Sequence, residues 1–143
     1  MIDQKTAPYA ALLLRVSLGV MFIAHSLYLK VVVFTIPGTV QFFESLGLPG
    51  FTAYATIAAE SLGGIALILG IQTRVVALAL VPVLAGALWV HAGNGWLFTA
   101  QGGGWEYPLF LTVAALVQAL IGDGALALAK SPSLERIKQL VAA

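Results

Sequence analysis

The sequence predicts an all-α membrane protein, a bundle of four transmembrane helices with a short interfacial helix in its first outer loop. Hydrophobic residues make up 60% of the 143 residues and charged residues only 9%, whereas about a quarter of a soluble domain is charged. Four apolar segments also have roughly the 17 to 25 residues that cross the hydrocarbon core as a helix. Lipid is therefore the expected solvent and partner of this chain.

The four spans are expected at residues 9–34, 52–70, 73–92 and 106–128. Only the sequence GIQTR, residues 70–74, separates the second span from the third. Glycine followed by polar and charged residues suits a tight turn at a membrane surface. One helix running through both segments would be far longer than a bilayer requires. We therefore expect a single transmembrane domain, residues 1–143.

The first outer connection is expected to contain a short interfacial helix. Turn-forming residues stand at both ends of it, PG at 37–38 and GLPG at 47–50. Between them Thr39 is the expected N-cap. The apolar face would consist of Phe42, Phe43 and Leu46.

The C-terminal segment 131–143 is predicted to form an amphipathic helix on the cytoplasmic surface. Ser131 or Ser133 would cap it. Its apolar face would consist of Leu134, Ile137, Leu140 and Val141.

Positive charges gather on one predicted side of the membrane. Lysine and arginine are enriched in the cytoplasmic connections of membrane proteins. Lys30 alone is expected on the outer side, and Arg15 joins the inner side if its side chain extends that way. The inner side otherwise holds Lys5, Arg74, Lys130, Arg136 and Lys138. Both termini are therefore expected in the cytoplasm.

The ionisable residues near the outer ends of the spans fall into two levels. At about 1.5 Å per residue, His25 and Glu60 lie roughly 12–14 Å below the outer edge, while His91 and Glu106 lie at it. Lys30 falls between the two levels. Because an isolated charge in the bilayer is costly, such groups turn inward and find partners. We expect a deep pair, His25 with Glu60, and a shallow pair, His91 with Glu106.

Two readings of the deep pair stay open. Ala59 and Gly63 form a small-xxx-small pair that lets another helix approach Glu60 closely. The pair would then be a hydrogen bond that only joins two helices. Alternatively, Glu60 and His25 exchange protons with a ligand in an outward-facing polar cavity, which is the reading we favour.

The outer level supplies the expected entry to that cavity. Glu106 follows GGG at 102–104 and begins the last span, where a helix N-terminus favours an anion. It is either a simple first-turn acid or a group that lines the entry with Lys30 and His91. Trp105 is assigned to the same ligand-binding set, although tryptophans at this level also serve as anchors at the headgroups.

Arg15 and Asp123 are predicted to form a structural pair at the inner surface. Measured from the outer edge, Arg15 lies about 28 Å down the first span and Asp123 about 26 Å down the fourth at helical rise. In the alternative, Arg15 extends to the surface and Asp123 is solvated.

Several other site classes are disfavoured by the sequence. The chain has no cysteine, which excludes thiol chemistry and cysteine-based metal sites within it. His25 and His91 differ in expected depth by about 13 Å, which argues against joint ligation of one haem iron. A metal site would need both acid–histidine pairs to merge, and none is assigned. The sequence has no basic patch that would indicate nucleic-acid binding.

Taken together, these residues resemble the DoxX family of small bacterial four-helix membrane proteins. The matching segments are LLLRVSLGVMFIAHSLYLK, FFESLGLPG, AAESLGGIALILGIQTR and GGGWEYPLFL, together with His91. The chain departs from the family where Ser26 replaces a glycine, Lys30 lies further from His25, and Asp123 replaces a proline. Recurring family positions fall on Arg15, His25, Lys30, Pro49, Glu60, Gly64, Gly70, Arg74, His91 and Glu106.

The resemblance implies a bacterial inner-membrane protein associated with quinone-coupled redox chemistry. The expected function is binding of a lipophilic small molecule, with a quinone as the candidate bound cofactor and electrons supplied by a redox partner protein. One alternative is a non-enzymatic membrane subunit that anchors or assembles a partner. Another is a small proton-coupled transporter, for which a homo-oligomer would supply further helices.

Overall fold

The fold is all-helical in the computed structural model, which describes residues 3–133, 135–136 and 139. A π-helix, η1, continues α1 without a break, so the two form one rod. The elements are α1 Ala7–Ile23, η1 Ala24–Val33, α2 Ile36–Ser45, α3 Phe51–Leu69, α4 Thr73–His91 and α5 Glu106–Ile121.

Three of the four predicted spans are confirmed as long apolar helices. They are the combined α1 and η1 of 27 residues, α3 of 19 and α4 of 19. The fourth prediction, 106–128, was too long, because α5 ends at Ile121 after 16 residues. Gly122 leaves the helix with a φ of +92°, and the Gln118 side-chain amide donates to its carbonyl. The hydrophobic run continues past this point, but the glycine turn ends the helix.

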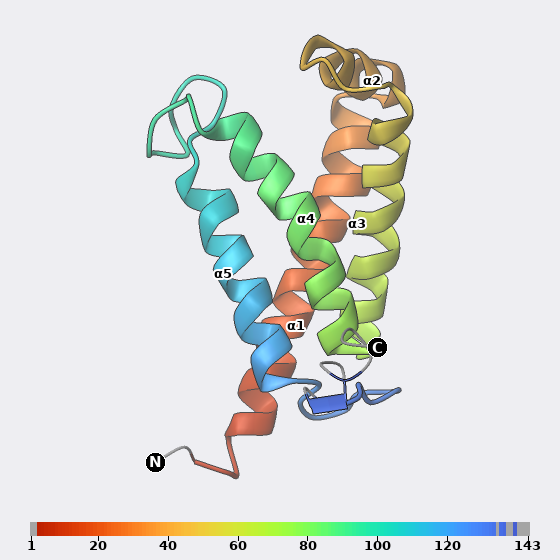
Figure 1. Ribbon diagram of the computed structural model, residues 1–143, viewed down its shortest axis with the longest axis vertical. Helices are drawn as coiled ribbons and strands as arrows, with labels where there is room; N and C mark the ends of the chain where they lie inside the picture. The colour runs from red at the N-terminus through yellow and green to blue at the C-terminus, as the bar shows by residue number, and fades with distance from the viewer. Residues whose placement is uncertain (1–2, 134, 137–138, 140–143) are drawn as a thin grey trace.

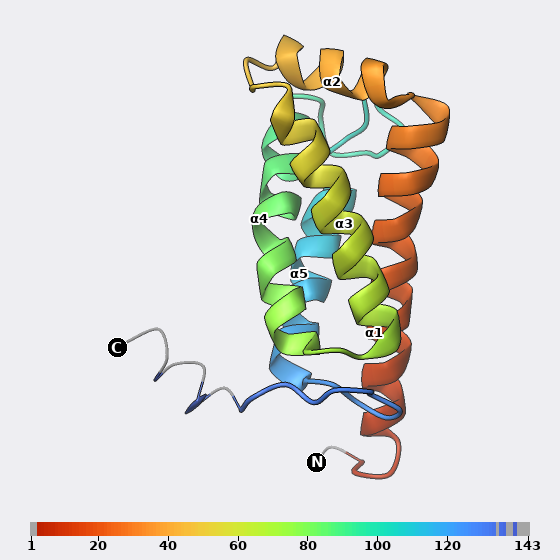
Figure 2. The same cartoon turned by 90° about the vertical axis from the view of Figure 1, so that its right-hand side faces the viewer.

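A short helix, α2, does occupy the connection between η1 and α3, but its cap is not the predicted residue. Thr35, with a φ of +62°, precedes the helix, and its hydroxyl accepts a hydrogen bond from the Gly38 amide. Thr39 is buried and donates to the Lys30 carbonyl at 2.7 Å, which ties α2 to the end of η1. Figure 2 shows α2 lying across one end of the bundle.

The long helices form two pairs, α1 with α3 and α4 with α5. The two pairs lie close at the end that holds the chain termini and diverge toward α2 (Figure 1). We call the diverging end, with α2 and residues 92–105, the cavity end. The opposite end, with residues 70–74 and 122–131, is the base.

Glycine lets α1 and α3 pack closely where they cross. A Cβ added at Gly64 would lie 2.8 Å from the Gly19 carbonyl oxygen and 2.8 Å from the Ile23 side chain. The sequence predicted a close helix approach at Ala59 and Gly63. At Gly63 the neighbouring helix is α4, because a Cβ added there would lie 2.8 Å from the Leu80 side chain.

The buried core is small, and the outside of the bundle is apolar. Large hydrophobic side chains that remain exposed include Tyr9, Leu13, Leu62, Phe110 and Leu120. An apolar exterior of this extent marks a surface that faces lipid. The core consists of Leu18, Phe22, Leu67, Ala77, Leu80, Leu84, Ala114, Ala115 and Ala119.

At the base, the buried Arg15 guanidinium joins α1 to two other parts of the chain. Its Nη1 donates to the Leu67 and Ile68 carbonyls at 2.9 and 2.7 Å, and these are carbonyls of the last turn of α3. Its Nε and Nη2 donate to the Asp123 and Ala125 carbonyls at 3.0 and 2.8 Å. Arg15 therefore supplies hydrogen-bond donors to main-chain carbonyls at the end of α3 and after α5, where regular helical bonding stops.

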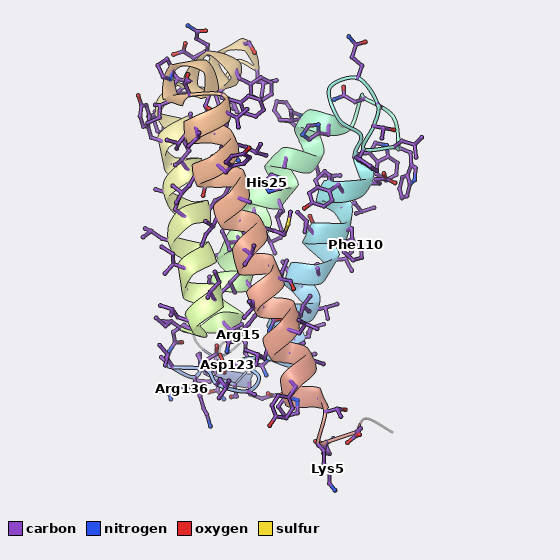
Figure 3. All side chains as sticks on the ribbon, turned by 180° about the vertical axis from the view of Figure 1, so that it is seen from behind. Lys5, Arg15, His25, Phe110, Asp123 and Arg136 are labelled. Atoms are coloured by element: carbon purple, nitrogen blue, oxygen red, sulfur yellow. The ribbon has the colours of Figure 1, made fainter. Side chains whose placement is uncertain are left out.

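The predicted Arg15–Asp123 pair is present as a contact, but not between the two charges. Arg15 reaches the main-chain oxygen of Asp123, while the Asp123 carboxylate accepts hydrogen bonds from Ser131 and from the Thr73 amide. Figure 3 shows Arg15 and Asp123 together at the base, with Lys5 and Arg136 at the same end. The bonds at Thr73 place a carboxylate at the N-terminus of α4, where the helix dipole favours it.

The predicted apolar face of the tail, Leu134, Ile137, Leu140 and Val141, lies outside the described residues. Ser133, one of the two predicted caps, accepts a hydrogen bond from the Arg136 amide at 3.3 Å. Ser131, the other, donates to Asp123 instead.

Replacing Gly64 should separate the helices of the α1–α3 pair. In Gly64→Ala, the new methyl group would meet the Gly19 backbone, so we expect a loss of about 1–3 kcal/mol in the free energy of unfolding. The matched control is Gly86→Ala in α4, where an added Cβ has no neighbour within 4 Å. Unfolding of the purified protein in mixed micelles, followed by circular dichroism, measures both. Equal stability of the two variants would contradict the crossing.

Asp123 should make stability depend on pH. Burial alone would raise the pKa of its carboxyl, but hydrogen bonds from Ser131 and Thr73 outweigh this effect, and its pKa lies below the ordinary value of 3.8. A carboxyl with a lowered pKa in the folded state stabilises the fold above its ordinary pKa, and this contribution is lost as the pH falls through the folded-state pKa. At neutral pH, Asp123→Asn should cost about 1–3 kcal/mol of unfolding free energy.

The difference between wild type and Asp123→Asn should shrink as the pH is lowered below 3.8. The same substitution made in a Ser131→Ala background should cost less, because two of the hydrogen bonds that depress the pKa are made by Ser131. A difference that stays constant from neutral to acid pH would show that the ionised carboxylate is not what stabilises the base.

Candidate functional site

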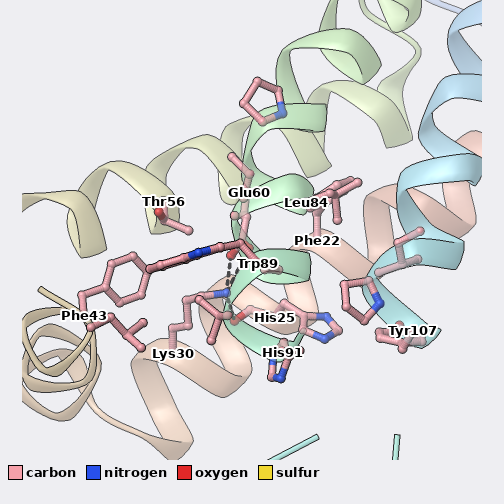
Figure 4. A pocket seen from close by; sticks show the side chains of 18 of the residues that line it. Phe22, His25, Lys30, Phe43, Thr56, Glu60, Leu84, Trp89, His91 and Tyr107 are labelled. Carbon is pink, nitrogen blue, oxygen red and sulfur yellow. Dashed lines mark hydrogen bonds and ion pairs between the residues drawn. The ribbon is translucent and has the colours of Figure 1, made fainter. Parts of the chain in front are cut away.

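A cavity of about 510 Å³ lies at the cavity end, between the two helix pairs. Figure 4 shows its side chains converging from α1, η1, α3, α4 and α5, with Phe43 of α2 at one side of the cavity. Its walls are mostly apolar and aromatic, as is usual for sites that bind small molecules. The apolar lining includes Met21, Phe22, Phe42, Phe43, Leu46, Pro82, Leu84, Trp89 and Leu111.

An ion pair between Lys30 and Glu60 is set into this apolar wall. The Lys30 ammonium lies 2.7 Å from Oε2 and 2.9 Å from Oε1 of Glu60. The two side chains are 18% and 8% exposed. The predicted hydrogen bond between Glu60 and His25 is absent, and Lys30 takes the place assigned to His25. Two charges held away from water are costly for folding, so the pair needs an explanation beyond stability.

The π-helix explains why Lys30 reaches Glu60. In an α-helix, residues five apart are turned by about 140° from each other. The i→i+5 hydrogen bonding of η1 brings such residues onto one face, and π-helical turns often occur at functional sites. Lys30 accordingly lies on the same face of η1 as His25, and its ammonium is 3.4 Å from the His25 carbonyl oxygen. The spacing of five residues between His25 and Lys30 thus suits a π-helix. In an α-helix the two side chains would point in different directions.

His25 lies in the cavity wall, and its ring is fixed from two sides. Its Nδ1 is 2.8 Å from the Met21 carbonyl oxygen, one turn earlier in α1. Its ring stacks on Tyr107 of α5, with centroids 5.8 Å apart and planes at 24°. The Tyr107 hydroxyl donates to the Met21 sulfur at 3.4 Å. These contacts join the two helix pairs across the cavity.

His91, at the last turn of α4, lines the same cavity and is held by the loop that follows it. Its Nδ1 lies 3.0 Å from each of the Gly102 and Gly103 carbonyl oxygens. The Asn94 side-chain amide donates to the same two carbonyls. His25 and His91 therefore belong to one site, although the sequence placed them on separate levels.

Glu106 and Trp105 do not line the cavity. The predicted pairing of Glu106 with His91 is replaced by a hydrogen bond from the Phe98 amide to Glu106 Oε1 at 2.8 Å. Trp105 packs against Trp96, with centroids 4.5 Å apart and planes at 86°. Both residues therefore organise the loop of residues 92–105. Glu106 also lies in a separate outer groove along α5, next to Phe110, which points away from the bundle in Figure 3.

The structure adds residues that sequence reasoning missed. Tyr107, to which the sequence assigned no role in the site, contacts His25 and lines the cavity. Ser26 is fully buried and accepts a hydrogen bond from the Ser61 hydroxyl at 3.0 Å, which joins η1 to α3 beside Glu60. The sequence signal for both was proximity: Tyr107 follows Glu106, and Ser26 follows His25.

Arg15 and Asp123 lie at the base, away from this cavity (Figure 3). Within the described residues, no three His, Cys, Asp or Glu side chains come together in a way that would hold a metal ion. The ionisable side chains that line the cavity are those of Lys30, Glu60, His25, His91 and Tyr107.

A family model named DoxX matches residues 10–93, which contain every cavity residue from α1 to α4. The chain belongs to the DoxX family. As a DoxX protein with three long apolar helices, it is a membrane protein. The resemblance read from the sequence is thus confirmed.

A curated DoxX relative carries the name "Putative oxidoreductase CatD" and comes from Bacillus subtilis (strain 168). It is 39% identical over 84 residues, 59% of this chain and 60% of the relative. The match therefore spans about three-fifths of that protein. No solved structure matches the chain significantly.

Proposed function

We propose that this protein is a redox-associated membrane protein that binds a quinone-type ring in the cavity at the cavity end. One observation carries the proposal, the Lys30–Glu60 ion pair in the wall of an otherwise apolar cavity. A buried pair of this kind is a weak source of stability, and ionisable groups within membrane helices are functional candidates by default. The name of the Bacillus relative agrees with a redox role.

The cavity has the two properties that a quinone-type ligand needs. Its aromatic and aliphatic walls suit a lipophilic ring, and α2 lies over its opening. Its polar groups are gathered around Lys30, Glu60 and His25, so the oxygen atoms of the ring would face this side. The volume of about 510 Å³ falls in the usual range for small-molecule sites.

In this proposal, Glu60 and His25 are the proton-exchanging groups. Reduction of a quinone to a hydroquinone takes up electrons and protons in equal number. Glu60 can hold a proton when the Lys30 contact opens, and the imidazole of His25 can accept or donate one. The electrons come from a redox partner protein, because the side chains of the cavity wall are not electron carriers.

Lys30 and His91 are proposed to contact the ligand directly, while Glu106 and Trp105 act through the loop. Glu106 holds the Phe98 amide and Trp105 packs on Trp96, so both fix the loop whose carbonyls orient His91. They are therefore positioning residues for the entry side of the site.

The proposed location is the bacterial inner membrane, with the base in the cytoplasm and the cavity open to the outer side. α5 would complete a four-span bundle and α2 would lie at the outer interface. The base carries the described cations Lys5, Arg74, Lys130 and Arg136, whereas the charges of α2 and the loop of residues 92–105 consist of Glu44 alone. This asymmetry follows the positive-inside rule.

Glu60→Gln should abolish the function while keeping the shape of the site. The amide removes the titrating proton, so we expect cells that depend on the plasmid-borne gene to become as sensitive to a quinone-type stress as the deletion strain. Glu44→Gln is the matched control, because Glu44 is an exposed acid of α2 outside the cavity. Glu106→Gln should give an intermediate loss through the loop.

Two outcomes of this experiment would change the proposal. Full resistance with a well-expressed Glu60→Gln protein would remove proton handling, and a membrane subunit that assembles a partner would become the better reading. Failure of Glu60→Gln to accumulate would make the carboxylate a packing element. Native mass spectrometry of the wild type extracted from membranes tests binding directly, because a quinone-type molecule should remain bound to it and be lost from Phe43→Ala.

The orientation has its own test. Reporter fusions placed after Gly38 and after Gly102 should report a location outside the cytoplasm, because both points lie at the cavity end. A fusion after Ala143 should report the cytoplasm. An outside location for the last fusion would reverse the membrane orientation, and the cavity would then open to the cytoplasm.

A further inference from the structure

The cavity offers many hydrogen-bond acceptors and few free donors. Its strongest donor, the Lys30 ammonium, has three N–H groups. These already face both oxygens of Glu60 and the His25 carbonyl, at 2.9, 2.7 and 3.4 Å. The Tyr107 hydroxyl donates its single proton to the Met21 sulfur. Neither group can donate to a ligand without giving up an existing contact.

The two histidines are held so that they add acceptors. A backbone carbonyl only accepts hydrogen bonds, so the Nδ1 atoms of His25 and His91 must carry their protons where they meet Met21, Gly102 and Gly103. In a neutral imidazole the proton on Nδ1 leaves Nε2 as a bare acceptor. No contact within the described residues occupies Nε2 of either ring.

The remaining polar atoms do not change this balance. Each carboxylate oxygen of Glu60 accepts one bond from Lys30 and keeps further lone-pair capacity. The Thr56 hydroxyl, which also lines the cavity, can donate or accept. Trp89 has an indole N–H, but 59% of this residue is exposed. Acceptors therefore outnumber uncommitted donors in the site.

We infer that the cavity is built for the reduced, hydroxyl-bearing form of its ligand, an uncharged aromatic diol, and binds it more tightly than the oxidised quinone. This inference rests on the proposed function and adds the redox state of the ligand. A diol supplies the hydroxyl donors that His25, His91 and Glu60 lack. A quinone carries only acceptors, so it leaves Nε2 of both histidines without a partner in a mostly apolar cavity, which is unfavourable.

Binding of three related probes to the purified wild-type protein tests the inference. Menadione is the oxidised form, menadiol the reduced form, and menadiol dimethyl ether keeps the reduced ring but has no hydroxyl donor. All three are measured without oxygen, in the same detergent and at the same pH. One hydrogen bond corresponds to roughly a tenfold change in affinity. Menadiol should therefore bind at least about tenfold tighter than either other probe.

The ratio of affinities separates this inference from the proposed function. If menadione, menadiol and the ether bind equally well, the cavity binds the ring but does not select its redox state, and the inference fails alone. Tighter binding of menadione than of menadiol would also overturn it. If none of the three binds, the proposed function fails as well.

Variants locate the acceptor. His25→Phe keeps a ring for stacking on Tyr107 but removes Nε2, so it should lower the menadiol preference by about tenfold and leave affinity for the ether nearly unchanged. The matched control, Phe43→Leu, alters an apolar wall residue and should weaken all probes alike. His91→Phe tests the second acceptor if His25→Phe does not fold. A preference that survives the loss of both imidazoles would show that the histidines do not cause it.

Discussion

The Arg15 guanidinium is the interaction on which the arrangement of this bundle depends. It lies in the middle of the base, 1% exposed, and donates to carbonyls of α3 and of the segment after α5. Carbonyls at a helix end and beyond it lack the regular helical hydrogen bonds, and in lipid an unpaired carbonyl is costly. A single planar cation with several fixed donors meets this need. It also leaves no room for a side chain at Gly70, where an added Cβ would lie 2.7 Å from the guanidinium.

Firm closure at the base allows the opposite end to stay open. Arg74 joins α4 to α5 at the same end, because its Nη1 donates to the Ala119 and Leu120 carbonyls at the end of α5. With both pairs fixed at one end, α4 and α5 can diverge from α1 and α3 toward α2 (Figure 1). The cavity is the space that this divergence leaves. Packing contacts between the two helix pairs are lost where the cavity lies. The stacking of His25 on Tyr107 restores one contact between the pairs there.

The polar groups of the cavity are positioned by backbone features that are themselves unusual. The π-helix turns Lys30 toward Glu60, and Thr39 holds the Lys30 carbonyl from α2. The loop of residues 92–105 orients His91 through its carbonyls. Irregular backbone at membrane depth is tolerated where it is buried in protein or lines a cavity. In this DoxX protein, η1 lines the cavity with His25 and Lys30.

The sequence by itself determined that lipid surrounds the chain, how many apolar segments it has and which ionisable residues lie in or near them. Composition and segment length report transfer into lipid, which depends on each stretch of chain alone. The partners were decided only by the tertiary structure. Glu60 pairs with Lys30 because η1 is wound as a π-helix, and Glu106 bonds to Phe98 because the outer loop folds back on α5. Counting residues along a straight helix predicts how deep a side chain lies in the membrane, but not the direction in which it points around the helix axis. That direction decides which side chains meet.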